Sequence, residues 1–363
     1  MRYEYLNIVG LMTGTSMDGI DISLVRTNGI QLERYNKNYF YNYSNKTKEF
    51  LLNMLKEDIN FNLKRKKFLD EVVTEEHYKA LKNLDIINKS DLIGFHGQTI
   101  YHDPSNKISI QLGNPKLLAQ MLRKDVIFDF RSNDIEMGGQ GAPLAPIYHK
   151  HIIDSFDLEL PSCILNIGGV ANLTFWDGKT LLGYDTGPGN GLMDNFIKKI
   201  SDNFYDEKGT LASRGTANNE MVKKFINHNY FKSPPPKSLD RNSFIKIYEQ
   251  LLEMNLEDPD TMASLLQFTI ESIIISINAL PKKVKSILVT GGGHKNTHLM
   301  NLLRKRLDIK LLNEDEINIE LDYVESELIA FLSARSIYNL PYTFPSTTGV
   351  SKLSTGAKFF SYL

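Results

Sequence analysis

The chain contains two similar runs of three predicted strands, and this duplication constrains its fold more than any other feature of the sequence. The first run has apolar strands at 6–12 and 20–26 and a third strand near 31–40. A loop rich in Gly, Thr and Ser follows the first of these strands. Asn28-Gly29 follows the second and has the composition of a tight hairpin turn.

The second run repeats this arrangement in the other half of the chain. Its strands are predicted at 163–167, 170–176 and 180–184, with Gly168-Gly169 after the first and Asp177-Gly178 as the hairpin turn after the second. Helices and further strands follow each run. The sequence therefore predicts an α/β fold with two lobes, each a mixed sheet flanked by helices.

We expect the first lobe at 1–135 plus about 342–363 and the second at 136–341. The glycine-rich stretch 132–146 is interpreted as the crossing between them, and the proline run at 233–237 as a rigid surface spacer. The other expected helices lie at 46–57, 65–84, 115–123, 262–280 and 326–338, and the other expected strands at 92–95, 108–112, 126–130, 287–290 and 320–323.

One carboxylate stands at the end of the predicted strand 180–184. Asp185 is followed by Thr186-Gly187-Pro188-Gly189-Asn190 and then by an amphipathic helix. A glycine turn at a helix N-terminus can bind phosphate through backbone N–H groups. An acid beside it can take a proton from an attacking hydroxyl or water, so Asp185 is predicted as a catalytic base.

The loop of the first run reads Thr13-Gly14-Thr15-Ser16-Met17-Asp18-Gly19. It is neither a Walker A sequence nor a dinucleotide fingerprint. Its amides and hydroxyls can wrap phosphates, and Asp18 can hold a magnesium ion through water. An ordinary hairpin turn has a similar composition, so this loop alone leaves both interpretations open.

A third glycine segment, Gly291-Gly292-Gly293, follows the predicted strand at 287–290. The three segments, in this order, resemble the superfamily of sugar kinases, actin and heat-shock ATPases. That resemblance implies two ribonuclease-H-like lobes with ATP in the cleft between them, and it makes the third segment the one that carries the adenosine.

Composition narrows the function classes. The chain has 363 residues, a formal net charge of −1 and 23% charged residues, so no global basic field favours nucleic acid. The basic run at 64–67 is interpreted as a solvated helix face. Cys163 is the single cysteine and is interpreted as a core residue. The apolar helix at 262–280 is expected in a core rather than a membrane, and we expect a cytoplasmic protein.

Several short sequence motifs, in the order in which they occur along the chain, resemble those of one protein family. They are Gly10–Asp21, Gly94–Thr99, Asp129–Arg131, Gly138–Leu144, Asn166–Asn172, Pro234–Ser238 and Thr290–Gly293, together with the Asp185 motif. They look like anhydro-N-acetylmuramic acid kinase over nearly the whole chain. The resemblance implies ATP- and Mg²⁺-dependent cleavage of the 1,6-anhydro ring with phosphorylation at O6. The product would be N-acetylmuramic acid 6-phosphate, for peptidoglycan recycling.

The resemblance also implies roles for individual residues. Asp185 becomes the catalytic base. Nucleotide binding is expected from Gly14, Thr15, Ser16, Met17, Asp18, Gly19, Ile20, Asp21, Gly187, Gly189, Asn190, Gly291, Gly292 and Gly293. Sugar binding is expected from Thr13, His96, Arg131, Gly168 and Glu325. Glu327 rivals Glu325, because the sequence around both departs from the usual family pattern.

Each assignment has a structural alternative. His96 can simply hold a loop, and Arg131 can form a structural ion pair, although the lactyl carboxylate of the sugar suits its bidentate grip. Other sugar or carboxylate kinases, or a non-catalytic ATP-binding switch, are the alternative functions. The expected partner is a small sugar, and we expect binding neither to nucleic acid nor to a membrane. A homodimer is a possible assembly.

Overall fold

A computed structural model of the protein describes residues 3–14, 17–56, 63–239 and 244–363. The chain forms two compact units. Unit 1 comprises Met1–His151 and Asp322–Leu363, and unit 2 comprises Ile152–Leu321. The chain thus leaves unit 1 within helix α6 (Pro146–Ser155), not in the glycine-rich stretch before it.

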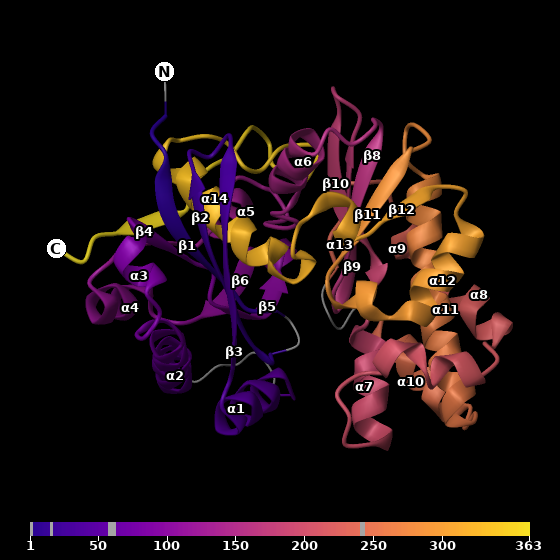
Figure 1. Ribbon diagram of the computed structural model, residues 1–363. Coiled ribbons are helices and arrows are strands. Elements are labelled where there is room, and N and C mark those ends of the chain that lie inside the picture. The colour runs from indigo at the N-terminus through magenta and orange to yellow at the C-terminus, as the bar shows by residue number, and fades with distance from the viewer. Residues whose placement is uncertain (1–2, 15–16, 57–62, 240–243) are drawn as a thin grey trace. The chain divides into compact units, whose positions relative to one another are not determined.

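The mixed sheet of unit 1 has the strand order β13-β7-β4-β1-β2-β3 in the described part of the chain (Figure 1). The first three strands of the chain are antiparallel neighbours, whereas β4 and β7 run parallel to β1. The strands are β1 (Leu6–Met12), β2 (Gly19–Thr27), β3 (Leu32–Asn42), β4 (Leu92–Phe95), β7 (Asp125–Phe128) and β13 (Lys358–Phe360), and β5 (Gln98–Asp103) and β6 (Ile108–Leu112) form a separate hairpin.

The helices of unit 1 cover the faces of this sheet. They are α1 (Asn45–Lys56), α2 (Leu63–Leu81), α3 (Ile86–Lys89), α4 (Pro115–Leu122), α5 (Ser132–Glu136) and α14 (Val324–Ile337). A buried core joins β1, β2 and β4 to α1, α2 and α4. Pro115 begins α4 and the Asn114 side chain accepts from Leu117 N–H, which is the cap expected from the sequence.

Helix α14 packs directly on the sheet because two strand positions lack side chains. A Cβ atom on Gly10 would stand 2.0 Å from Ser326 O, and one on Gly94 would stand 2.3 Å from Ser333 Oγ. This close approach is the reason that α14 belongs to unit 1. The division expected from the sequence, with boundaries after 135 and 341, had placed it in the other lobe.

Unit 2 repeats the strand pattern of unit 1. Its sheet has the order β10-β9-β8-β11-β12, with β8, β9 and β10 antiparallel and β11 and β12 parallel to β8. The strands are β8 (Ser162–Ile167), β9 (Val170–Trp176), β10 (Leu181–Pro188), β11 (Ser286–Thr290) and β12 (Lys310–Leu312). The duplication of three antiparallel strands predicted from the sequence is confirmed.

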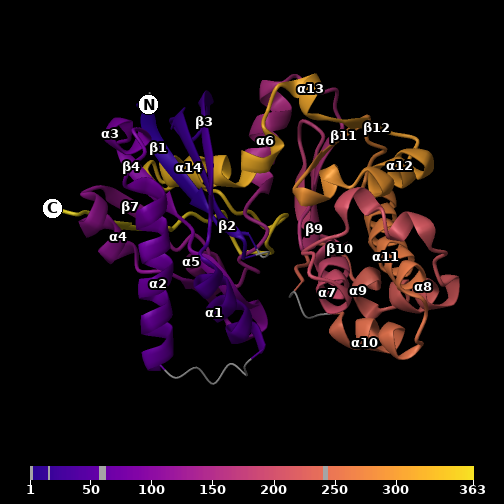
Figure 2. The ribbon, with the colours of Figure 1, turned by 60° about the horizontal axis from the view of Figure 1, so that its bottom comes forward.

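The helices of unit 2 are α7 (Gly191–Ile200), α8 (Asn219–Ile226), α9 (Asn229–Lys232), α10 (Ile245–Glu253), α11 (Asp258–Asn278), α12 (Thr297–Arg306) and α13 (Glu314–Ile317). Figure 2 shows α7, α8, α9, α10 and α11 labelled close together in this unit. Among the described helices, α11 alone is long and apolar enough to span a membrane, but most of its apolar window is buried in the core of unit 2, as expected for a core helix.

Two expectations need correction. The strand before Asp185 does not end there: β10 runs on to Pro188, with a change of register at Thr186, so the acid lies inside the strand. Residues 320–323 were expected as a strand, but Leu321–Tyr323 form a short 3₁₀ turn that leads into α14.

Candidate functional site

Glycine segments from three parts of unit 2 meet at the carboxyl ends of β8 and β11. Gly189 N–H donates to Gly169 O at 3.0 Å, and Asn190 N–H donates to Gly168 O at 2.7 Å. A Cβ atom on Gly189 would lie 2.2 Å from Gly168 O, so only glycine fits at that position. The chain of β10 therefore lies directly against the Gly168-Gly169 turn.

The third glycine segment joins the other two. Gly291 has φ +73°, and a Cβ atom there would lie 2.3 Å from Asn166 Oδ1. A Cβ atom on Gly292 would have Asn190 Nδ2, at 3.9 Å, as its nearest neighbour. The carboxyl ends of parallel strands are where α/β sheets bind ligands, and backbone exposed by glycine suits an anion there.

Asp185 is buried beside this cradle and is held by hydrogen bonds to main chain and side chain. Leu239 N–H donates to its Oδ2 at 2.7 Å, and Asp185 N–H donates to Lys237 O at 3.0 Å. The Tyr230 hydroxyl donates to Asp185 O at 2.5 Å. The proline run lies at the surface, as expected from the sequence, with Pro234 and Pro235 exposed. It leads directly into the segment that contacts Asp185.

In unit 1, the described part of the loop after β1 is tied to the start of β5. Thr13 Oγ1 donates to Gly97 O at 2.9 Å, and Gln98 Nε2 donates to Gly14 O at 3.0 Å. Met17 has φ +57°, and Asp18 is exposed. The predicted phosphate contacts of Thr15 and Ser16 lie outside the described residues.

The last three residues of the predicted phosphate loop belong to β2. Gly19 cannot carry a side chain, since its Cβ atom would lie 2.3 Å from Tyr41 O. Ile20 is fully buried in the core of unit 1, so its side chain packs there and only its backbone is open to a ligand role. Asp21 pairs with Met12 and Phe40 across the strands.

His96 and Arg131 lie together at the carboxyl ends of β4 and β7. Arg131 donates through Nε and Nη2 to His96 Nε2, at 3.2 and 3.0 Å, and through Nη1 to Gly141 O at 2.7 Å. Because Arg can only donate, His96 carries its proton on Nδ1, which lies 2.8 Å from Gly97 O. Burial lowers the pKa of His96 to about 3, and the Arg131 cation contributes to the same shift.

The structure separates Glu325 from Glu327. Glu327 is buried, and both of its oxygens accept from Arg34 Nε at 2.9 Å. The Tyr148 hydroxyl also donates to Glu327 Oε2 at 2.5 Å. Glu325 is only half-buried, in the first turn of α14. Glu327 therefore holds α14, β3 and α6 together, and Glu325 is the better candidate for a ligand.

Asp18 fits the way in which kinases bind magnesium. Within the described ranges, no group of three or more His, Cys, Asp or Glu side chains converges as a metal site. Magnesium in kinases keeps its waters and needs only one or two carboxylates plus the phosphates, so the exposed Asp18 carboxylate fits.

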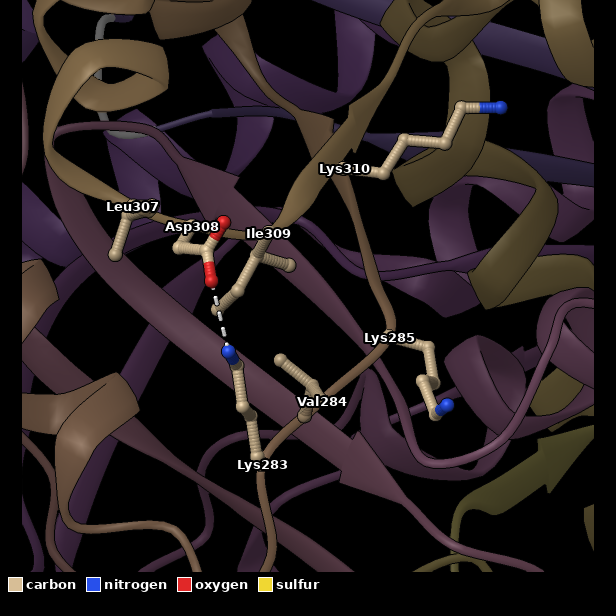
Figure 3. A pocket seen from close by; sticks show the side chains of 7 residues that line it. All are labelled: Lys283, Val284, Lys285, Leu307, Asp308, Ile309 and Lys310. Carbon is tan, nitrogen blue, oxygen red and sulfur yellow. Dashed lines mark hydrogen bonds and ion pairs between the residues drawn. The ribbon is translucent and has the colours of Figure 1, made fainter.

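A lysine-lined hollow of about 540 Å³ lies elsewhere in unit 2 (Figure 3). Lys283, Lys285 and Lys310 line it near the amino ends of β11 and β12. Each of these lysines forms an ion pair, with Asp308 at 2.9 Å, Glu159 at 3.3 Å and Glu316 at 2.6 Å respectively. Since the glycine cradle lies at the opposite ends of the same strands, this hollow is separate from the candidate site.

Sequence reasoning missed Tyr230, Gln98 and the Leu239 amide. Tyr230 contacts Asp185 through its hydroxyl from the single-turn helix α9, and Leu239 does so through the N–H of an irregular segment. No periodic pattern in the sequence marks either contact. Gln98 did give a signal, because it directly follows the His96-Gly97 pair that drew attention.

Comparison with known proteins agrees with the family suggested by the motifs. The family model described as anhydro-N-acetylmuramic acid kinase matches residues 6–361. A protein of that name from Rhodopseudomonas palustris (strain BisB18) is 37% identical over 97% of this chain and 99% of its own length. Another, from Pelagibacter ubique (strain HTCC1062), is 36% identical over 97% of this chain and 98% of its own length. Among solved structures, an activator of 2-hydroxyisocaproyl-CoA dehydratase from Clostridium difficile with bound ADPNP has a TM-score of 0.42 and 12% identity, covering 92% of this chain and 97% of that one. The matches over nearly the full length show that the chain belongs to the anhydro-N-acetylmuramic acid kinase family.

Proposed function

We propose that this protein uses ATP to open the 1,6-anhydro ring of N-acetylmuramic acid and to phosphorylate O6, giving N-acetylmuramic acid 6-phosphate. The observation that supports this most directly is the placement of Asp185. It is a buried carboxylate with its orientation fixed by the Leu239 amide, and it stands beside a glycine cradle suited to phosphate. The identity of the sugar in this proposal comes from the family to which the chain belongs.

The proposed chemistry consists of two linked displacements. Asp185 takes a proton from water as the water oxygen attacks C1 of the sugar. The C1–O6 bond breaks, and its electron pair stays on O6. O6 then bonds to the γ-phosphorus of ATP, the bond from that phosphorus to the β–γ bridging oxygen breaks, and ADP leaves. Magnesium, when bound, offsets the phosphate charge.

Unit 1 supplies the proposed grip on the sugar. Arg131 is held by neutral His96 and by Gly141 O, so its guanidinium is oriented before a ligand arrives. A guanidinium suits the lactyl carboxylate of the muramic sugar. Glu325, half-buried in the first turn of α14, is the proposed acceptor for a sugar hydroxyl, because Arg34 binds the rival carboxylate of Glu327. Thr13 fixes the start of the phosphate loop.

Phosphoryl transfer from labelled ATP to a panel of amino sugars and their 1,6-anhydro forms tests the proposal. We expect label in the 6-phosphate of N-acetylmuramic acid only when the anhydro sugar is supplied. Asp185→Asn should lower kcat about 10²–10⁴-fold with little change in either KM, because it removes the base alone. Faster transfer to another sugar would overturn the assignment of the substrate. ATP binding without transfer to any sugar would favour the switch alternative.

A further inference from the structure

The segment from Tyr230 to Leu239 contacts Asp185 at three points. β10 is the edge strand of its sheet, so one side of its backbone has no neighbouring strand. At Asp185 this side is covered, because Asp185 N–H donates to Lys237 O and Leu239 N–H donates to Asp185 Oδ2. The segment thus covers the open edge of β10 at the acid.

Tyr230 contacts the backbone carbonyl of the same residue. Its hydroxyl donates to Asp185 O at 2.5 Å. The amide N–H, the carbonyl and one carboxylate oxygen of Asp185 therefore each have a partner from this single segment. Fixing both the backbone and the carboxylate restricts the direction in which the acid points. Such restriction is what a base needs, since a misplacement of about 1 Å can cost roughly 10²-fold in rate.

Lys237 ties the two ends of the segment together. Its ammonium group donates to Tyr230 O at 3.0 Å and lies 4.5 Å from the centre of the Tyr230 ring. A cation held over an aromatic face is attracted to it, more strongly where water is excluded. Lys237 is half-buried, and burial lowers its pKa. Pro234, Pro235 and Pro236 precede it and restrict the backbone, which reduces the entropy lost on forming these contacts.

We propose that Lys237 and Tyr230 are positioning residues for the reaction, which together hold the segment 237–239 against Asp185 and so set the orientation of the base. This inference rests on the proposed function, because it assumes that Asp185 is the base. The residues themselves need not touch the substrate. Their effect is therefore expected in kcat and not in the KM of ATP or of the sugar.

The test compares Lys237→Met and Tyr230→Phe with matched controls that lie away from Asp185. Lys198→Met removes an exposed lysine that also lies over an aromatic ring, that of Phe204, and Tyr205→Phe removes an exposed hydroxyl. Steady-state phosphoryl transfer to 1,6-anhydro-N-acetylmuramic acid is measured for all four, with thermal unfolding as the check of folding. We expect kcat to fall about 10–100-fold for Lys237→Met and about 3–10-fold for Tyr230→Phe, with both KM values nearly unchanged.

A double-mutant cycle separates positioning from a general structural role. In an Asp185→Asn background, Lys237→Met should cause almost no further loss, because there is no base left to position. Lys237→Arg keeps a cation over the Tyr230 ring and should recover part of kcat. Additive losses in the cycle, or wild-type kcat in both Lys237→Met and Tyr230→Phe, would overturn the inference. If Lys237→Met fails to fold, Tyr230→Phe alone decides.

The two proposals fail in different ways. If Asp185→Asn keeps its activity, the assignment of the base is wrong, whatever the other variants do. If Asp185→Asn is inactive while the Lys237 and Tyr230 variants are as active as the controls, the base stands and only the positioning role is refuted.

Discussion

Replacing His96 with glutamine should weaken the pH dependence of the free energy of unfolding. His96 is buried, donates from Nδ1 to Gly97 O and accepts at Nε2 from Arg131. Protonating Nε2 would remove both Arg131 hydrogen bonds and place two cations side by side. The pKa is therefore lowered from 6.5 to about 3 by burial first and by Arg131 second.

The sign follows from proton binding in the two states. Between pH 6.5 and about 3 the unfolded chain carries a proton on this histidine that the folded site refuses. The stabilisation is fully present above pH 6.5 and is lost as the pH falls toward 3. The slope is about 1.4 kcal/mol for each pH unit, so His96 alone should lower the free energy of unfolding by about 2 kcal/mol between about pH 7 and about pH 5.

Urea denaturation of the wild type and of His96→Gln, each at about pH 7 and about pH 5, measures this contribution. Comparing the two differences cancels the contributions of the buried His77 and His149 and of the half-buried His102, whose pKa values are also lowered, chiefly by burial. Glutamine can still accept from Arg131 but cannot titrate. His298→Gln, on α12 of unit 2, measures the cost of the same exchange away from the site. Equal pH dependence in wild type and His96→Gln would refute the reasoning.

Three further variants test the sugar-binding role of Arg131, the packing of α14 and the Arg34–Glu327 ion pair. Arg131→Ala should raise the KM of the muramic sugar far more than that of ATP, and equal effects on both in steady-state assays would reduce Arg131 to a structural role. Gly10→Ala should cost about 1–3 kcal/mol or more in urea denaturation, because its Cβ atom would stand 2.0 Å from Ser326 O, and a wild-type midpoint would contradict the α14 packing. Arg34→Met should cost about 3–5 kcal/mol by leaving the buried Glu327 carboxylate without its cation, and a loss below about 1 kcal/mol in the same assay would show that Tyr148 alone satisfies it.

The sequence allowed the strand pattern and the glycine segments to be predicted, because both follow local rules. Asn28-Gly29 and Asp177-Gly178 locate the β2–β3 and β9–β10 hairpins. The carboxyl ends of parallel strands lie at one edge of a sheet. The contact of Leu239 with Asp185 could not be predicted in this way. It joins an irregular segment to an edge strand 54 residues away, and nothing periodic marks such a pair.

The choice between Glu325 and Glu327 shows a second limit. Residues two apart on a helix point about 200° apart, so one of the two must face the sheet side and the other away from it. The sequence does not say which, since both are acidic and both lie in the first turn of α14. Burial of Arg34 and Tyr148 against Glu327 decides it, and that ion pair joins parts of the chain 293 residues apart.

The duplication also explains why the candidate site residues lie at equivalent strand ends in the two units. β1 and β4 are the central parallel pair of unit 1, and β8 and β11 are their counterparts in unit 2. Thr13 and His96 follow the first pair, and Gly168 and Gly291 follow the second, so equivalent strand ends carry the candidate ligand residues in both units. The third strands differ. β10 carries the Asp185 carboxylate, whereas the last residues of β3, at 39–42, are Tyr, Phe, Tyr and Asn. Two copies of one strand pattern thus provide two sheet edges with candidate ligand residues. Only the second copy has a carboxylate on its third strand near the glycine cradle. This asymmetry is why the proposed base is assigned to unit 2.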